Sequence, residues 1–275
     1  MRLIDSHAHL TYPELSGQVE QVLHRAEQAG VETVITIGTD VLDARQAVAL
    51  TTQYPGRVFA GAGFHPHHAE RVAADDLREM AQLWQNAGVV ALGEMGLDYH
   101  YDFAERSVQR KVFVQQLEAA RPIDKPVVIH CREALDDCAA MLVDRGFERR
   151  RVVFHCFTGT EAEAARIAEH GWRISFTGIV TFPKSQELQA IAREYPADKL
   201  MIETDSPYLS PVPVRGTKPN EPAFVAHTAQ FLARLRGVSL DDLAERTSRN
   251  TREFFGLTAR VMDTGRGRQT DTAGP

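Results

Sequence analysis

Cysteine is scarce in this sequence, and no two cysteines form a close pair. The three that are present, Cys131, Cys138 and Cys156, make neither a CxxC motif nor an even set. Disulfide frameworks and structural zinc knuckles are built from such pairs, so the pattern argues against both classes of protein. We expect the three thiols to be reduced and buried.

Long apolar runs and an excess of positive charge are also missing. No stretch approaches the roughly 18 consecutive apolar residues of a membrane span, and no basic segment followed by an apolar one marks a leader. We therefore expect a cytoplasmic protein. The formal net charge of −6 argues against a broad basic face that coats nucleic acid, although a local phosphate site remains compatible with it.

Eight short apolar runs alternate with amphipathic segments along the chain. The runs span residues 2–7, 32–38, 57–64, 89–97, 126–131, 151–157, 172–180 and 199–205. Helical periodicity follows each of the first seven, over 17–30, 41–54, 74–87, 104–121, 133–145, 160–170 and 185–195, and returns at 222–236 and 239–255. Eight such units predict an α/β fold, a TIM (β/α)8 barrel.

The main alternative is a doubly wound open sheet, which also alternates strands and helices. No GxGxxG motif follows the first run, and the composition does not change before residue 257. We therefore predict a single domain over residues 1–257. The segment 258–275 is rich in Gly, Thr and Arg and has little apolar periodicity, so we expect a flexible C-terminal tail.

Side chains able to bind metals gather where the predicted strands end. They are His7, His9, His65, Glu94, His130, His155 and Asp205. Because TIM barrels carry their active sites at the C-terminal ends of the strands, all seven are expected on one rim. We expect the other histidines to be surface or packing residues: His24, His170 and His227 in predicted helices, and His67, His68 and His100 in loops.

Strand alternation decides which of these side chains face the interior of the barrel. Residues i and i+2 share a face and lie roughly 6.5–7 Å apart, so His7 and His9 can reach one centre. The same alternation points His130 and His155 inward and sends the cysteine after each of them outward, so we expect no thiolate ligand. Asp5 and Glu203 lie one step deeper, where we predict that they support the ligands by hydrogen bonds.

Four imidazoles and two carboxylates are more ligands than one tetrahedral ion accepts, and they suit two ions that share a carboxylate. We predict that one ion is held by His7, His9, Glu94 and Asp205. The second would be held by His130, His155 and the other oxygen of Glu94. A barrel that has lost catalysis is another possible class, but the complete ligand set argues against it.

The chain resembles the TatD deoxyribonucleases, a branch of the amidohydrolase-type metal-dependent hydrolases. The motifs DSHAHL, GFHPH, ALGEMGLDYH, VQRKVFVQQLEAA, KPVVIHCREA, FHCFTGT and MIETDSPYL occur in the order and spacing of that family, from residue 2 to about 257. The resemblance implies a TIM barrel and the same six ligands. It also implies phosphodiester hydrolysis in DNA, commonly as a 3′–5′ exonuclease dependent on Mg²⁺ or Mn²⁺, while some members are linked to RNA or to wrongly charged tRNA.

Two positions refine this resemblance. After the eighth run the family usually has a sequence close to RGKRNEP, whereas this chain has RGTKPNEP, one residue longer, with Arg215, Asn220 and Pro222 matched. Substrate preference therefore transfers less directly than metal binding. The fourth run offers Glu94 and no lysine, which argues against amidohydrolases that use a carbamylated lysine there.

The expected reaction is cleavage of single-stranded DNA by a hydroxide that bridges the two metal ions. Asp205 is the candidate base and shares the catalytic centre with Glu94. Candidates for phosphate contacts are His65, Arg132, Arg215 and Lys218. Hydrolysis of an ester or amide, such as D-aminoacyl-tRNA, is the alternative reaction at the same site.

The identity of the metal is predicted differently by two lines of reasoning. An imidazole-rich shell favours Zn, Mn, Ni or Fe over Mg, which prefers oxygen ligands. The family resemblance instead points to Mg or Mn in activity. We expect the purified protein to carry Zn, Ni or no metal and to respond to Mg or Mn in an assay. We also expect it to act on DNA and to be a monomer.

Overall fold

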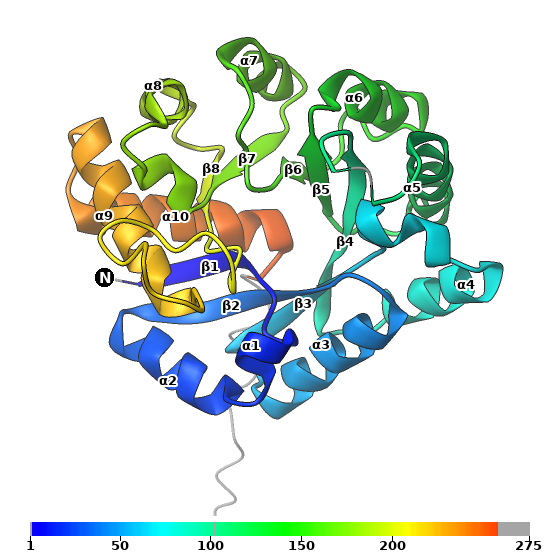
Figure 1. Cartoon of the computed structure of the whole chain (residues 1–275), viewed down its shortest axis with the longest axis horizontal. Coiled ribbons are helices and arrows are strands. Elements are labelled where there is room, and N and C mark those ends of the chain that lie inside the picture. Colours follow the sequence, from blue (N-terminus) through cyan, green and yellow to red (C-terminus); the bar gives the residue numbers. More distant parts are fainter. Residues whose placement is uncertain (1, 102, 258–275) are drawn as a thin grey trace, which may run out of the picture.

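A closed sheet of parallel strands forms the centre of the molecule (Figure 1). The computed structural model describes residues 2–101 and 103–257, where the strands pair in chain order. They are β1 (Leu3–Ala8), β2 (Val31–Gly38), β3 (Val58–Ala62), β4 (Val89–Asp98), β5 (Val127–Arg132), β6 (Val152–Phe154), β7 (Arg173–Phe176) and β8 (Leu200–Ile202). The barrel closes because Ala8 pairs with Ser206 and the Asp205 N–H donates to the His7 carbonyl over 2.9 Å.

Helices surround the sheet and confirm the predicted single-domain TIM barrel. They are α1 (Pro13–Ser16), α2 (Val19–Gln28), α3 (Val41–Gln53), α4 (Ala74–Leu83), α5 (Arg106–Ala120), α6 (Leu135–Asp144), α7 (Glu161–Glu169), α8 (Gln186–Glu194), α9 (Val225–Arg236) and α10 (Leu240–Phe255), with 3₁₀ turns η1 (Pro66–Arg71), η2 (Gly178–Thr181) and η3 (Pro222–Phe224). In the described part of the chain, no helix has the length and apolar character needed to cross a membrane. The predicted tail 258–275 lies outside the described residues.

Side-chain caps place the ends of several helices. Thr160 Oγ1 accepts from the Glu163 N–H before α7, and Glu163 Oε2 accepts from the Thr160 N–H over 2.7 Å, which is a capping box. Ser239 caps α10 by accepting from the Asp242 N–H over 3.0 Å, where the sequence predicts a helix start. The first residues of α7 and α10 are therefore determined largely by local sequence.

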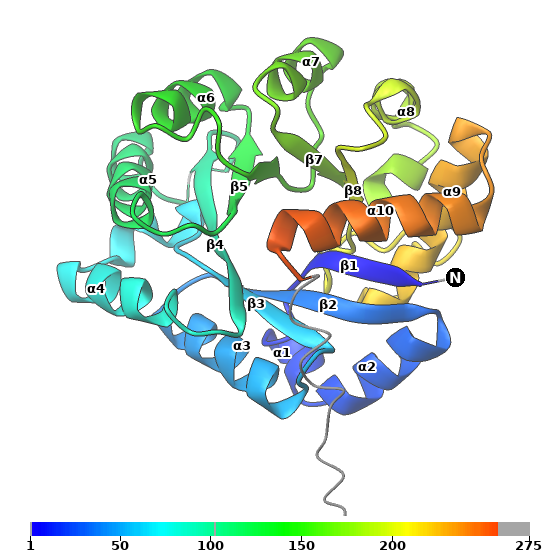
Figure 2. The ribbon, with the colours of Figure 1, turned by 180° about the vertical axis from the view of Figure 1, so that it is seen from behind.

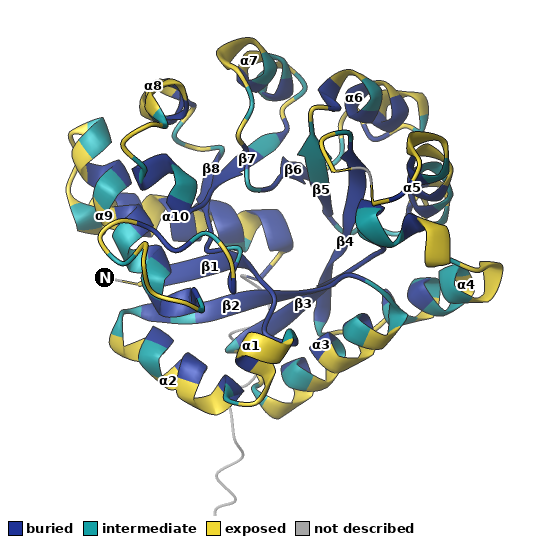
Figure 3. Cartoon of the chain, in the orientation of Figure 1, coloured by how far each residue is buried: buried dark blue, intermediate teal, exposed yellow. Residues whose placement is uncertain are grey.

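Two apolar layers pack on opposite sides of the strands, as the buried strands in Figure 3 indicate. The larger layer lies between strands and helices. The smaller one fills the barrel interior, where Phe254, Phe255 and Leu257 pack with Ile4 and Met201. Figure 2 shows α10 beside β1 on the side opposite the view of Figure 1. Because α10 packs its apolar face there, the barrel is filled at that end, and polar side chains gather at the other.

Three strands are shorter than the sequence predicts. Strand β6 ends at Phe154 and β8 at Ile202, so His155 and Asp205 follow their strands instead of lying within them. Strand β7 ends at Phe176, where the Thr177 side chain accepts from the Ile179 N–H and begins η2. The chain departs from extended geometry because Asp205 has a φ of 54°.

Candidate metal centre

The ends of β1, β4 and β8 bring four side chains together. His7 lies in β1 and His9 follows it, and their Nε2 atoms are 3.3 Å apart. His7 Nε2 lies 3.3 Å from Glu94 Oε2 and 3.7 Å from Asp205 Oδ1. His9 Nε2 lies 3.9 Å and 3.4 Å from the same two oxygens. Both imidazoles therefore face the same pair of carboxylate oxygens.

The other oxygen of Glu94 faces a second group of imidazoles. His155 Nε2 lies 2.6 Å from Glu94 Oε1, and His130 Nδ1 lies 2.9 Å from it. His65 Nε2 lies 3.4 Å from this oxygen and follows β3. Glu94 thus stands between two sets of side chains, one on each carboxylate oxygen.

Glycine in β4 lets Glu94 occupy this position. Gly93 has a φ of 115°, and a Cβ atom there would lie 2.4 Å from the Val128 carbonyl oxygen on β5. A Cβ atom on Gly63, which follows β3, would lie 2.6 Å from the Gly93 Cα atom. The backbones of three neighbouring strands approach closely here because both residues lack a side chain.

The charges within the cluster favour an ionised carboxylate among imidazoles. Burial opposes ionisation of Glu94, but the charge of His155 and the hydrogen bonds from His130 and His155 outweigh it and hold the pKa of this carboxyl well below its usual range. Burial lowers the pKa of His65 to about 3, so this ring is neutral at physiological pH. His65 Nδ1 accepts from the His67 N–H over 3.1 Å, so the proton of the neutral ring lies on Nε2, which faces Glu94.

The hydrogen bonds of the cluster fit a divalent metal. His9 Nδ1 lies 3.2 Å from the Ile37 carbonyl oxygen and donates to it, which leaves the lone pair of Nε2 directed at the cluster. Glu94 Oε2 is buried and accepts no hydrogen bond from the described residues. Both groups of side chains, one with His7, His9 and Glu94 and the other with Glu94, His130 and His155, are compact enough to hold a metal ion.

Glu203 supports the segment that carries His155. Its Oε1 atom accepts from the Cys156 N–H over 2.6 Å and lies 3.4 Å from His155 Nδ1. Its Oε2 atom accepts from the Ser6 hydroxyl over 3.2 Å. The carboxylate therefore joins β1, β8 and the turn after β6 beneath the cluster.

Asp5 acts on the backbone at the closure of the barrel. It accepts from the Thr204 N–H over 2.9 Å, from the Thr204 hydroxyl over 2.5 Å and from the His7 N–H over 3.3 Å. Burial raises the pKa of Asp5 to about 8. Its contacts hold the segments that carry His7 and Asp205 side by side, and none of them reaches an imidazole ring.

Asp98 and His67 lie at the site, although Asp98 is not among the residues predicted from the sequence and His67 was expected to be a surface or packing residue. Asp98 Oδ2 lies 2.9 Å from both His130 Nε2 and His67 Nε2. The expectation for His67 was wrong, because this ring lines the cavity and forms a further possible metal group with His65 and His130. Asp98 lies four residues after Glu94, and that even spacing in one strand could have indicated it.

Two further expectations, those for His68 and Cys156, differ from the structure. His68, expected to be a surface or packing residue, also lines the cavity. Cys131 packs against the outer apolar layer as predicted, although part of it reaches the cavity. Cys156 lines the cavity instead of turning outward, because it follows the end of β6 and has a φ of 46°. Strand alternation does not apply beyond the strand.

A cavity of about 920 Å³ extends from the cluster to the surface. Two of the four candidates for phosphate contacts line it, and two do not. His65 and Arg132 line it, with the Arg132 guanidinium 5.3 Å from the centre of the Tyr101 ring. Arg215 is exposed and lies 4.1 Å from the centre of the Phe182 ring. Among the described residues that line the cavity, neither Arg215 nor the exposed Lys218 is found.

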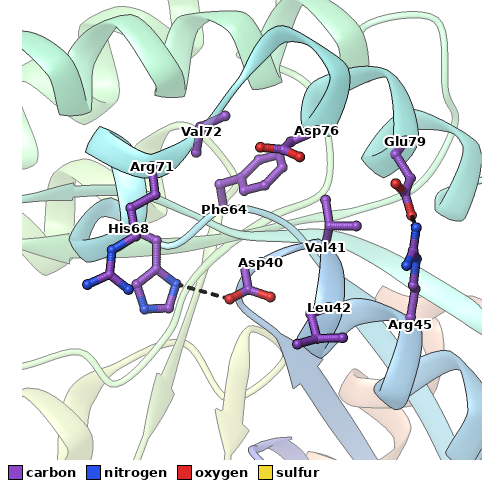
Figure 4. A pocket seen from close by; sticks show the side chains of 10 residues that line it. All are labelled: Asp40, Val41, Leu42, Arg45, Phe64, His68, Arg71, Val72, Asp76 and Glu79. Atoms are coloured by element: carbon purple, nitrogen blue, oxygen red, sulfur yellow. Dashed lines mark hydrogen bonds and ion pairs between the residues drawn. The ribbon is translucent and has the colours of Figure 1, made fainter.

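A smaller cavity of about 370 Å³ adjoins the first one between α3, η1 and α4 (Figure 4). Asp40, Leu42 and His68 line both cavities. In Figure 4, His68 faces Asp40 with 4.0 Å between Nδ1 and Oδ2, and Arg45 pairs with Glu79 at the far side. The rim of the site is therefore hollowed beyond the cluster itself.

Known proteins match most of the chain. Residues 4–256 match the family model described as TatD related DNase. The chain is 36% identical to the 3′-5′ ssDNA/RNA exonuclease TatD of Erwinia amylovora over 93% of its length and 100% of that protein. It is 35% identical to the uncharacterized metal-dependent hydrolase YabD of Bacillus subtilis over 93% of its length and 99% of that protein.

A solved structure has the same fold. The crystal structure of YjjV, a TatD homolog from Escherichia coli, superposes with a TM-score of 0.87 at 31% sequence identity, covering 93% of this chain and 98% of that one. Family model, relatives and structure each match more than nine-tenths of the chain. The chain belongs to the TatD-related DNase family of metal-dependent hydrolases.

Proposed function

We propose that this protein hydrolyses phosphodiester bonds of DNA, as a 3′–5′ exonuclease on single strands, with two divalent ions that share Glu94. The proposal rests on the position of the Glu94 carboxylate, whose two oxygens face different sets of imidazoles. His7, His9 and Asp205 would complete one set, and His130 and His155 the other. The name of the Erwinia relative supports the choice of substrate and polarity.

The cluster suits an anionic substrate. Two divalent ions beside the ionised carboxylates of Glu94, Asp205 and Asp98 would leave a net positive charge, which would attract a phosphodiester. Such ions lower the pKa of a water molecule and polarise a phosphate oxygen. The neutral His65 ring, within 3.4 Å of Glu94, would contact the phosphate, and Arg132 would contact it from the cavity wall.

Asp205 is the proposed base. Its side chain is 14% exposed, against 2% for Glu94, and it lines the cavity from which a water molecule would arrive. Oδ1 would accept the proton of the attacking water while His9, 3.4 Å away, holds the carboxylate in place.

Replacing Asp205 tests this role. Asp205→Asn should reduce turnover by at least about 100-fold, because an amide cannot accept the proton, while circular dichroism stays unchanged. The matched control is Asp124→Asn, an exposed carboxylate before β5 at the opposite end of the barrel. An Asp205→Asn protein with wild-type turnover would remove Asp205 from the mechanism.

The substrate and polarity require an assay with blocked ends. Single-stranded DNA labelled and blocked at either terminus in turn should release nucleotides only when its 3′ end is free. The same preparation is offered D-aminoacyl-tRNA, because the YabD relative is described only as a metal-dependent hydrolase. If the protein deacylates this tRNA but releases no nucleotides with any divalent metal, its activity is that of an esterase and the nuclease proposal is wrong.

Metal analysis tests the two-ion proposal. We propose Mg or Mn in the active enzyme, and Zn or Ni in the protein as purified, because imidazole-rich sites favour the latter. Elemental analysis should give two ions for each chain, and anomalous diffraction should place one on each side of Glu94. A single ion away from Glu94 would contradict the proposal. Cytoplasmic location and a monomeric state stay predictions from the sequence.

A further inference from the structure

Exposed aromatic side chains gather around the mouth of the candidate site. Among the described residues, the exposed large apolar side chains are Leu42, Tyr101, Phe103, Val143, Tyr208, Val212 and Val238. Every aromatic member of this set lines the large cavity, and so does Leu42. Scattered apolar residues on a surface are ordinary, but a concentration at one cavity indicates a binding surface.

One aromatic wall stands beside β4 and β5. Tyr101 and Phe103, which are 44% and 65% exposed, lie in the loop after β4 with ring centres 5.7 Å apart and planes inclined by 23°. The Phe103 ring packs on His67, with 4.7 Å between centres, and His67 lies 5.8 Å from the ring centre of His130. Ring contacts therefore lead from a candidate metal ligand to solvent. We call Tyr101 and Phe103 the loop wall.

A second aromatic wall stands at the closure of the barrel. The Tyr12 ring stacks on His9, with 4.5 Å between centres and an angle of 17°. Tyr208, which is 51% exposed, meets Tyr12 edge to face at 6.2 Å. We call Tyr12 and Tyr208 the seam wall. Because β1 and β8 lie across the closed sheet from β4 and β5, the two walls flank the cluster from opposite sides.

We propose that the two walls bind unpaired nucleobases on either side of the phosphate that is cleaved. A base presents flat faces that stack on aromatic rings whatever its sequence, and these faces are accessible in a single strand but covered in a duplex. A phosphodiester at Glu94 would carry one neighbouring nucleoside toward the loop wall and the other toward the seam wall. This inference rests on the proposed function and names the part of the substrate that the rim recognises.

Equilibrium binding tests the walls without requiring turnover. A fluorescent single-stranded oligonucleotide whose 3′ end is blocked against cleavage is titrated with wild-type protein and with Phe103→Ala and Tyr208→Ala, each loaded with the same metal. Each substitution should weaken binding at least about 5-fold, because stacking on one ring contributes that much or more. Phe103→Tyr and Tyr208→Phe, which keep the ring, should restore it. Val238→Ala, an exposed apolar residue outside the cavity lining, should bind as wild type.

An abasic residue identifies the partner of each ring. Steady-state rates are compared for an oligonucleotide with a base or an abasic residue on one side of the terminal phosphodiester, with and without Phe103→Ala or Tyr208→Ala. Removing ring and base together should cost no more than removing either one, because they form one interaction. The effect should appear mainly in KM. Fully additive losses would overturn the pairing of wall and base.

The outcomes separate the inference from the proposed function. Cleavage of DNA with equal binding by wild type, Phe103→Ala and Tyr208→Ala would overturn the aromatic subsites and leave the nuclease intact. Binding that depends on the rings without any cleavage would support the subsites and contradict the nuclease. Duplex DNA that binds as tightly as a single strand would contradict base stacking, and absence of binding by every protein would overturn both.

Discussion

At the scale of single residues, His130 shows how the site is held together. Its Nδ1 atom faces Glu94 and its Nε2 atom faces Asp98, each at 2.9 Å. An ionised Asp98 accepts the N–H at Nε2, so the lone pair of Nδ1 points to Glu94 and the ring cannot turn freely. Burial opposes ionisation of Asp98, but hydrogen bonds from His130 and His67 outweigh it and hold its pKa well below the usual range.

Asp98→Asn is therefore expected to weaken metal binding without removing a ligand. Asp98 Oδ2 receives both rings, while Oδ1 accepts from the backbone N–H groups of His100 and Tyr101. A neutral amide has one oxygen for these two tasks, so we expect a loss of affinity of about 10- to 100-fold. Competition with a chelating dye measures it. Asp137→Asn, the same change at a carboxylate that binds Tyr99 on the outside of the barrel, is the control and should keep wild-type affinity. Equal affinity in the two variants would show that Asp98 does not position His130.

At the scale of elements, the ends of the strands decide which side chains reach the cavity. Strands β6 and β8 are three residues long, and left-handed backbone at Cys156 and Asp205 follows them. Strand β4 is longer, and its neighbours approach it closely at Gly93. Local backbone geometry, more than strand alternation alone, therefore aims His155, Asp205 and Glu94 at one centre.

Gly93→Ala should destabilise the barrel. A Cβ atom would overlap the Val128 carbonyl, and a φ of 115° is unfavourable for alanine, so we expect a loss of at least about 1 kcal/mol in the free energy of unfolding. Urea titration in the presence of a chelator measures this apart from metal binding. Gly17→Ala is the control, because nothing lies within 4 Å of its Cβ position and its φ is −74°. Equal stability of the two variants would mean that the close approach is absent in solution.

At the scale of the whole molecule, the two ends of the barrel differ in the side chains that fill them. Phe254, Phe255 and Leu257 fill the interior at one end, while buried carboxylates and imidazoles occupy the other. Carboxylates and imidazoles brought together without a cation are costly to bury. A metal that binds only the folded chain should therefore contribute to the stability of the entire barrel.

Removing the metal should lower the melting temperature. Ligand binding at about 100 times Kd stabilises a folded protein by about 2.7 kcal/mol, so chelation should cause a shift of several degrees. Calorimetry with and without chelator, alongside metal analysis, measures the change. Glu94→Gln, which loses the shared carboxylate charge, should melt at the same temperature in both conditions. An unchanged melting temperature in fully demetallated wild type would argue that the cluster is stable on its own.

The sequence by itself determined the order of the elements and the identity of the cluster. Alternating polarity and helix caps are local properties, so the eight units and the starts of α7 and α10 follow from neighbouring residues. Strand ends in such a barrel share one rim, which is why His7, His130 and Asp205 could be grouped although they lie far apart in the chain. The DSHAHL pair faces Asp205 across the closure of the barrel, as the order of strands requires.

Only the tertiary structure decided the surroundings of that cluster. Asp98 meets His130 across 32 positions of sequence, and His67 joins them from a loop, where no periodicity predicts direction. The inward turn of Cys156 and the two aromatic walls likewise depend on loops whose backbone leaves the regular strand. Contacts of this kind arise from the closure of the sheet and the packing of loops over it, and a pattern along the chain does not encode either directly.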